Sequence, residues 1–78
     1  MGRKRRVSPK KLPGKLRELR FGLELTQEEL AKKLGTDSGS ISRFETGKRE
    51  PSLLEILAYS RLTGIAIEVL LDDRLKLR

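Results

Sequence analysis

The feature that most constrains this chain is a pair of short helical segments joined by a tight glycine turn. Thr26 precedes Glu29 by three residues, which is the spacing of a capping box at a helix start. Apolar residues then recur at helical spacing up to Leu34, and Gly35 follows where a helix ends most readily with a positive φ. The pattern predicts a first helix over 27–34.

A second helix is predicted over 38–46, immediately after the turn. Asp37 can cap it, because a carboxylate accepts from the free N–H groups at a helix start. Ile41 and Phe44 give it a narrow apolar side, and Gly47 ends it. Two short helices joined in this way form a helix-turn-helix, a motif that lays its second helix in the major groove of DNA.

These residues resemble a known family. The segments that carry the resemblance are 26–35, 41–43, Glu45, 47–49 and 51–52. They resemble the phage-repressor class of helix-turn-helix proteins, the Cro/C1 or Xre type, over about residues 12–73. The resemblance implies a compact all-α domain of five helices that binds operator double-stranded DNA, usually as a homodimer, and regulates transcription.

The remaining elements follow from apolar spacing and helix breakers. A helix is predicted from about Pro13 to Phe21 or Leu23. Another should start near 51–52 and run to about Thr63, and a short one should cover 67–71. We expect a basic arm over 1–11, one domain over 12–73 and a tail over 74–78 that is either a short strand or frayed.

Composition excludes several classes of protein. The chain has no Cys and no His, which removes disulfides, thiolate metal sites and the commonest general base. We therefore expect no cofactor, no metal and no enzymatic activity; the Ser residues have no His partner, and no glycine-rich phosphate loop is present. No apolar run is long enough to cross a membrane, so we expect a cytoplasmic protein.

The positive charge is concentrated at the start of the chain. Residues 1–11 contain no acid, and they carry most of the net charge of +7. Their basic residues are Arg3, Lys4, Arg5, Arg6, Lys10 and Lys11. We interpret this segment as a flexible arm that neutralises phosphates or enters a minor groove. The alternative is a solvated tail that aids solubility only.

Specific DNA contacts are implied by the resemblance. Positions that face base edges in relatives are occupied by Ser38, Gly39, Ser42 and Arg43, and phosphate contacts are expected from Gln27, Ser40, Lys48 and Arg49. Arg43 is the best candidate for base readout, since a guanidinium can bond guanine O6 and N7 together. It could instead contact phosphate or pair with Glu45, and Ser40 could instead pack at the turn.

Two positions depart from the family pattern. Relatives usually have a longer side chain at the position of Ser38 or Gly39, so base contacts from the start of this helix should be few. Relatives also often have Gly where this chain has Glu24, which leaves the end of the first helix uncertain.

The C-terminal apolar residues favour a dimer. The expected interface consists of Ile67, Leu70, Leu71 and Leu75. The alternative is that most of these side chains complete the core of the monomer. No effector domain is recognisable, so we expect a repressor that acts by occupying its operator. The alternative function is an antitoxin or protein-interaction adaptor with the same fold.

Overall fold

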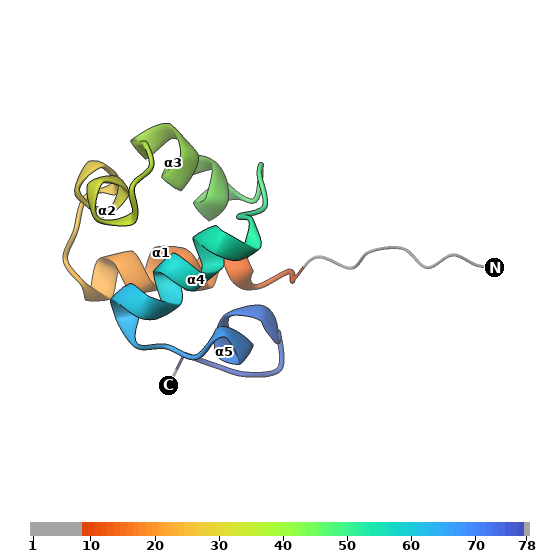
Figure 1. Ribbon diagram of the computed structural model, residues 1–78. Helices are drawn as coiled ribbons and strands as arrows, with labels where there is room; N and C mark the ends of the chain where they lie inside the picture. Colours follow the sequence, from red (N-terminus) through yellow and green to blue (C-terminus); the bar gives the residue numbers. More distant parts are fainter. Residues whose placement is uncertain (1–8, 78) are drawn as a thin grey trace.

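Residues 9–77 are described by the computed structural model, and this part of the chain forms helices and no strand. The helices are α1 Leu12–Gly22, α2 Gln27–Leu34, α3 Ser38–Thr46, α4 Leu53–Thr63 and α5 Ile67–Leu71 (Figure 1). The predicted bounds of α2, α3 and α5 are confirmed. The first helix begins at Leu12 and ends at Gly22, and Ser52 is the N-cap of α4, in agreement with the start predicted near 51–52.

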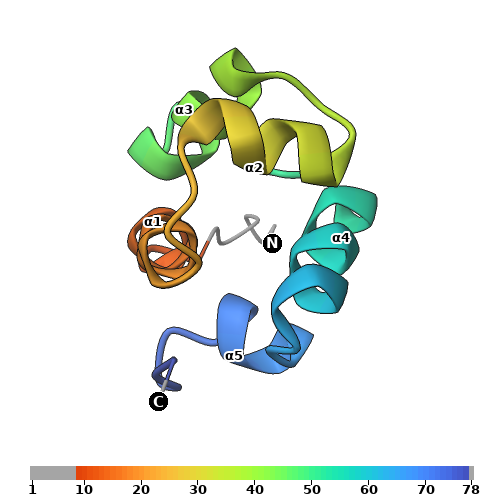
Figure 2. The ribbon, with the colours of Figure 1, turned by 90° about the vertical axis from the view of Figure 1, so that its left-hand side faces the viewer.

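Every helix contributes to one small core. In Figure 2, α2 and α3 lie above the other helices, α5 lies below, and α1 and α4 flank the space between them. That space is filled by fully buried side chains from all five helices: Leu16, Leu30, Ile41, Phe44, Tyr59 and Leu70. The Phe44 and Tyr59 rings meet edge to face, with centroids 6.5 Å apart. Each of the buried Leu, Ile and Phe side chains contributes about 1.5–3 kcal/mol through burial.

Leu70 corrects part of the predicted dimer interface. Its exposed fraction is 0%, because α5 packs against both α1 and α4. The side chain therefore belongs to the core of the monomer and is not accessible to a partner. Leu71 and Leu75 remain 38% and 40% exposed, and Ile67 is partly buried at the edge of the core.

Local capping explains where the helices that carry the turn begin and end. Thr26 and Glu29 form the predicted capping box, in which Glu29 N donates to Thr26 Oγ1 at 3.0 Å and Thr26 N donates to Glu29 Oε1 at 2.8 Å. Gly35 and Gly47 adopt φ of 75° and 78° at the ends of α2 and α3. The spacing of these caps is why the sequence pattern located the two helices correctly.

Hydrogen bonds connect the start of α1 with the end of α5 in both directions. The Lys15 side chain is buried, and its Nζ donates to the carbonyls of Val69 and Asp72, the latter at 2.9 Å, where a cation suits the negative helix end. In return, the Asp73 carboxylate accepts from the backbone N–H groups of Lys10 and Lys11 at 2.9 and 3.0 Å. The last two basic residues of the predicted arm are thus fastened by their backbone to the domain.

The C-terminal segment is not a strand in the described range, so that alternative was wrong. Asp72 bonds the side chain of Arg74, with Oδ2 2.9 Å from Arg74 Nη2. Leu77 is partly buried against the core, whereas Leu75 is more exposed. The segment after α5 therefore lies along the domain.

The carboxylates of Asp72 and Asp73, just after α5, predict a contribution to stability that is lost in acid. Bonds from Arg74 lower the pKa of Asp72 to about 2, and the N–H groups of Lys11 and Lys10 lower the pKa of Asp73. A carboxyl whose pKa is lower in the folded state than in the unfolded chain stabilises the fold above about pH 4 and loses that effect as the pH falls. The urea midpoint should therefore drop between pH 5 and pH 2.

Asp73→Asn isolates the contribution of that carboxylate. We expect a lower urea midpoint than the wild type at pH 7 and a smaller further drop on acidification. Equal midpoints at pH 7 and equal acid responses would contradict the role given to Asp73.

Candidate functional site

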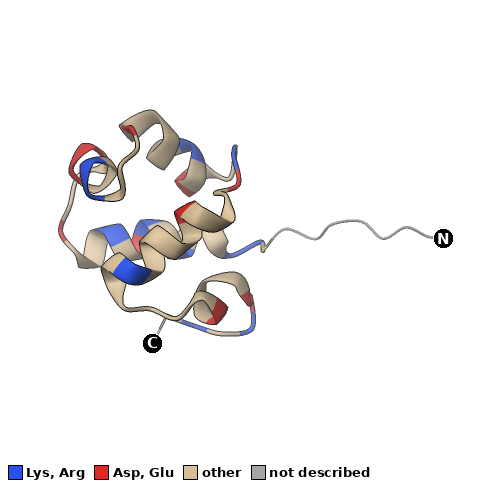
Figure 3. Cartoon of the chain, viewed as in Figure 1, with Lys and Arg blue, Asp and Glu red and all other residues tan. Residues whose placement is uncertain are grey.

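The outward face of α3 carries the residues predicted to read bases. Ile41, Phe44 and Glu45 on the opposite side of this helix are buried. Ser38, Gly39 and Ser42 are half-buried, and Arg43 is exposed. The helical repeat brings positions 38, 39, 42 and 43 to one side, so the structure gathers these four residues as expected. Basic residues also occur in the loop after α3 and at the start of α1 (Figure 3).

The start of α3 is closed by Asp37 and Ser40. Asp37 Oδ2 accepts from Ser40 N at 3.0 Å, and Asp37 Oδ1 accepts from Ser40 Oγ at 2.9 Å. These bonds lower the pKa of Asp37, and the nearby charge of Arg43 lowers it further. Ser40 is only 4% exposed, so its hydroxyl packs at the turn, which is the second of its two predicted roles.

Gly39 makes room for Arg43. A Cβ at position 39 would lie 3.0 Å from Asp37 Oδ2 and 3.4 Å from Arg43 Nη1. The guanidinium therefore folds back over Gly39 toward the helix start, which is the direction that long side chains prefer in helices. The short residue that departs from the family pattern thus leaves space for the arginine that is best suited to base readout.

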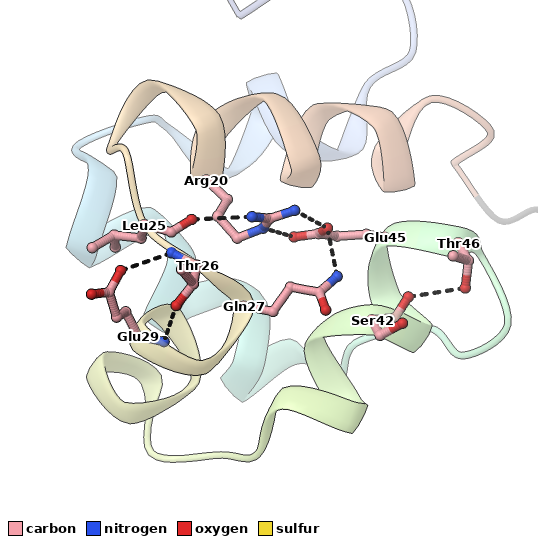
Figure 4. Close-up of polar contacts among 8 residues, drawn as sticks. All are labelled: Arg20, Leu25, Thr26, Gln27, Glu29, Ser42, Glu45 and Thr46. Atoms are coloured by element: carbon pink, nitrogen blue, oxygen red, sulfur yellow. Dashed lines mark hydrogen bonds and ion pairs between the residues drawn. The ribbon is translucent and has the colours of Figure 1, made fainter.

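A buried ion pair fixes α3 against the first two helices. Arg20 Nε donates to Glu45 Oε2 at 2.8 Å and Arg20 Nη2 donates to Glu45 Oε1 at 3.0 Å, a bidentate pair (Figure 4). Arg20 Nη1 also donates to the Leu25 carbonyl at 3.0 Å, and Gln27 Nε2 donates to Glu45 Oε1 at 3.3 Å. The side chains of Arg20 and Glu45 are 13% and 2% exposed, and the hydrogen bonds to Glu45 raise the pKa of Arg20.

The contacts of Glu45 bear on two of the sequence predictions. Glu45 bonds Arg20 and Gln27, so the alternative in which Arg43 pairs with Glu45 is not what the structure shows. The Gln27 side chain bonds Glu45 of α3, and the phosphate contact expected from Gln27 remains a prediction. Sequence reasoning missed Arg20. A signal was present, since an acid on the buried side of α3 requires a cationic partner.

The loop after α3 begins with two backbone bonds to the end of the helix. Lys48 N and Arg49 N both donate to the Arg43 carbonyl, at 3.0 and 3.3 Å. Lys48 is exposed. Arg49 instead lies against the domain: its Nη1 donates to Ser40 Oγ at 3.0 Å, and its Nη2 is 3.3 Å from Glu55 Oε2. The two residues predicted to clamp phosphates therefore have different surroundings.

The end of the predicted arm lies beside this loop. A Cβ at Gly47 would be 3.5 Å from Pro13 Cγ, so the start of α1 touches the turn that ends α3. Lys10 and Lys11 are exposed just before that contact. The other arm residues, Arg3, Lys4, Arg5 and Arg6, lie outside the described residues.

Two other features are absent from residues 9–77. None of the helices there has the length and apolar character needed to cross a membrane. Groups of three or more possible metal ligands are also absent from this range.

Known proteins resemble this chain in sequence. A family model described as Helix-turn-helix matches residues 16–70. The HTH-type transcriptional activator BcrR of Enterococcus faecalis is 39% identical over 58 residues, which are 74% of this chain and 28% of BcrR. The uncharacterized HTH-type transcriptional regulator MJ0272 of Methanocaldococcus jannaschii is 40% identical over 57 residues, 73% of this chain and 86% of MJ0272. The chain thus spans under a third of one relative and most of the other.

Solved structures resemble it in fold. The P22 c2 repressor, in complex with a synthetic operator, superimposes with a TM-score of 0.75 and 27% identity, covering 80% of this chain and 94% of the repressor. The restriction-modification controller protein C.AhdI of Aeromonas hydrophila gives a TM-score of 0.68 and 36% identity over 74% of this chain and 88% of that protein.

The Arg20–Glu45 pair should show strong coupling in stability. Glu45→Leu leaves a largely buried guanidinium unpaired and should lower the free energy of unfolding by about 3–5 kcal/mol, and Arg20→Met should be similarly damaging. The double variant should lose much less than the sum of the two, because neither charge then remains buried alone. Urea unfolding of the four proteins measures this cycle.

Glu28→Gln, on the exposed side of α2, is the matched control and should stay within about 0.5 kcal/mol of the wild type. Strict additivity of the two single substitutions would show that the pair does not act as a unit.

Proposed function

The chain belongs to the helix-turn-helix family of Cro/C1 type, a family of DNA-binding transcriptional regulators, and we propose that it recognises a specific operator through α3. The observation that carries the proposal is the outward face of α3, where Ser38, Ser42 and the exposed Arg43 share one side of the helix and the Arg43 guanidinium lies over Gly39. A helix with such small residues can approach base edges closely.

Arg43 supplies the specific contact in this proposal. Its exposed guanidinium reads a guanine in the major groove, and such a bidentate contact contributes about 1–3 kcal/mol of discrimination. Ser38 and Ser42 add hydrogen bonds that tolerate several bases, and Gly39 leaves room for the Arg43 guanidinium.

In this proposal, other residues around Arg43 bind the DNA phosphates. Gln27 is the first residue of α2, and the backbone N–H groups there that the capping box leaves unused can donate to a phosphate oxygen. Lys48 belongs to the loop after α3, and Lys10 and Lys11 precede Pro13, which lies against Gly47 at the end of α3. The basic arm that precedes them adds charge, so binding should be strongly salt-dependent.

We propose that the protein binds as a homodimer and acts as a repressor by occupancy. Ile67, Leu71 and Leu75 offer apolar surface beside the buried Leu70, and a two-fold pair would place two copies of α3 about one turn of DNA, roughly 34 Å, apart. A protein bound across a promoter blocks polymerase without needing an effector domain. Such a regulator would work on the chromosome in the cytoplasm.

Selection of bound duplexes from a random DNA library, at near-physiological salt, tests this function. We expect an inverted repeat whose half-sites are about one turn apart. Arg43→Ala should relax the preference at one base pair in each half-site, because only that contact is lost. Arg61→Ala, an exposed substitution on α4, is the matched control and should leave the selected sequence unchanged.

Other outcomes of the selection would contradict parts of the proposal. Retention without enrichment would mean that binding is driven by charge and not by sequence. A single half-site bound by one protein molecule would exclude the dimer. No retention at all would favour the adaptor function.

A further inference from the structure

Arg49 is held by three groups of its own domain. Its Nη1 donates to Ser40 Oγ at 3.0 Å, its Nη2 lies 3.3 Å from Glu55 Oε2, and its guanidinium carbon is 5.0 Å from the centre of the Phe44 ring. The side chain is 44% exposed, so about half of its surface is covered. A side chain whose only role is to bind phosphate would be expected to extend into solvent.

The partners of Arg49 tie together the starts of two helices. Ser40 bonds Asp37, the cap of α3. Glu55 is the third residue of α4, and its other oxygen accepts from the N–H of Ser52, the cap of that helix, at 2.7 Å. Arg49 therefore joins the cap of α3 to the cap of α4 from within the loop that separates these helices.

Lys48 depends on the same loop. Its backbone N–H is bonded to Arg43, but its side chain is exposed, so the direction in which it points is set by how firmly the loop is held. Arg49 directly follows Lys48 and is bonded to the domain, so it limits the movement of the loop that carries Lys48.

We propose that Arg49 is a positioning residue and not a phosphate ligand: it locks the loop after α3 onto the domain, so that Lys48 meets the DNA backbone in a fixed place. This inference rests on the proposed DNA-binding function and replaces the phosphate contact expected for Arg49 from the sequence. A guanidinium is required, because its planar fork bonds Ser40 and Glu55 together while stacking on Phe44. A lysine ammonium keeps the charge but cannot do all three.

The conservative substitution distinguishes the two roles. Arg49→Lys keeps a positive charge at the loop, so a phosphate ligand would survive it almost unchanged. A positioning residue that needs the guanidinium would not tolerate it. We therefore expect Arg49→Lys and Arg49→Met to weaken binding similarly, by about fivefold or more, with little change in the slope of log affinity against log salt. Lys48→Met, in the same loop, should instead lower that slope by about 0.9.

The affinities should be measured on the duplex enriched in the selection, or on a 30-base-pair duplex of mixed sequence if none is enriched. Near wild-type affinity for Arg49→Lys, together with a slope reduced by about 0.9 for Arg49→Met, would overturn the proposal and restore Arg49 as a phosphate ligand.

A measurement without DNA tests the lock itself. In urea unfolding, Ser40→Ala should destabilise the wild type more than it destabilises Arg49→Met, because the hydrogen bond between residues 40 and 49 is already absent in the latter. Equal effects in the two backgrounds would show that the lock is absent. If the wild type binds neither duplex, the proposed function fails and the positioning role fails with it, whereas the coupling still reports whether Arg49 closes the loop.

Discussion

The buried carboxylate of Glu45 is the constraint on which the arrangement of this domain depends. It is 3% exposed, and it bonds Arg20 from α1 and Gln27 from α2. A carboxylate left unpaired at that depth would cost several kcal/mol, so α3 is stable only where both partners reach it. A buried ion pair adds little net stability compared with apolar packing, but its geometry admits few alternatives. The pair therefore sets the direction of α3 more than it stabilises the fold.

The buried side of α3 determines where its exposed side chains point. Phe44 and Glu45 point inward, and the neighbouring Arg43 must then point outward. At the helix start, Asp37 fixes the first turn while Gly39 leaves space for the guanidinium. A short helix with a rigid rear surface can present a single arginine in one orientation, which is what discrimination between base pairs requires. Core packing and the proposed DNA recognition thus depend on the same nine-residue helix.

Capping residues and glycines predicted where the helices lie, whereas contacts between residues far apart in the sequence were not predicted. Caps and glycines at 26, 35, 37 and 47 act within a few residues, so the bounds of α2 and α3 followed from the sequence. Arg20 and Glu45 are 25 residues apart, and Lys15 reaches Val69 across 54, so no local pattern links them. Leu70 was assigned to a partner because apolar spacing does not say which side of a terminal helix meets its own core. The positive φ of 58° at Glu24 shows that the family's preference for glycine there is conformational.

The central claim is that α3 and the loop after it form the surface that meets DNA. Backbone amide chemical shifts, followed by NMR as the enriched duplex is added, test it most directly because they report on every segment at once. The account predicts the largest changes at 38–43 and Lys48, with smaller ones at the start of α2. Changes confined to α4 and α5, with α3 unaffected, would contradict it and place the functional surface on the opposite side of the domain.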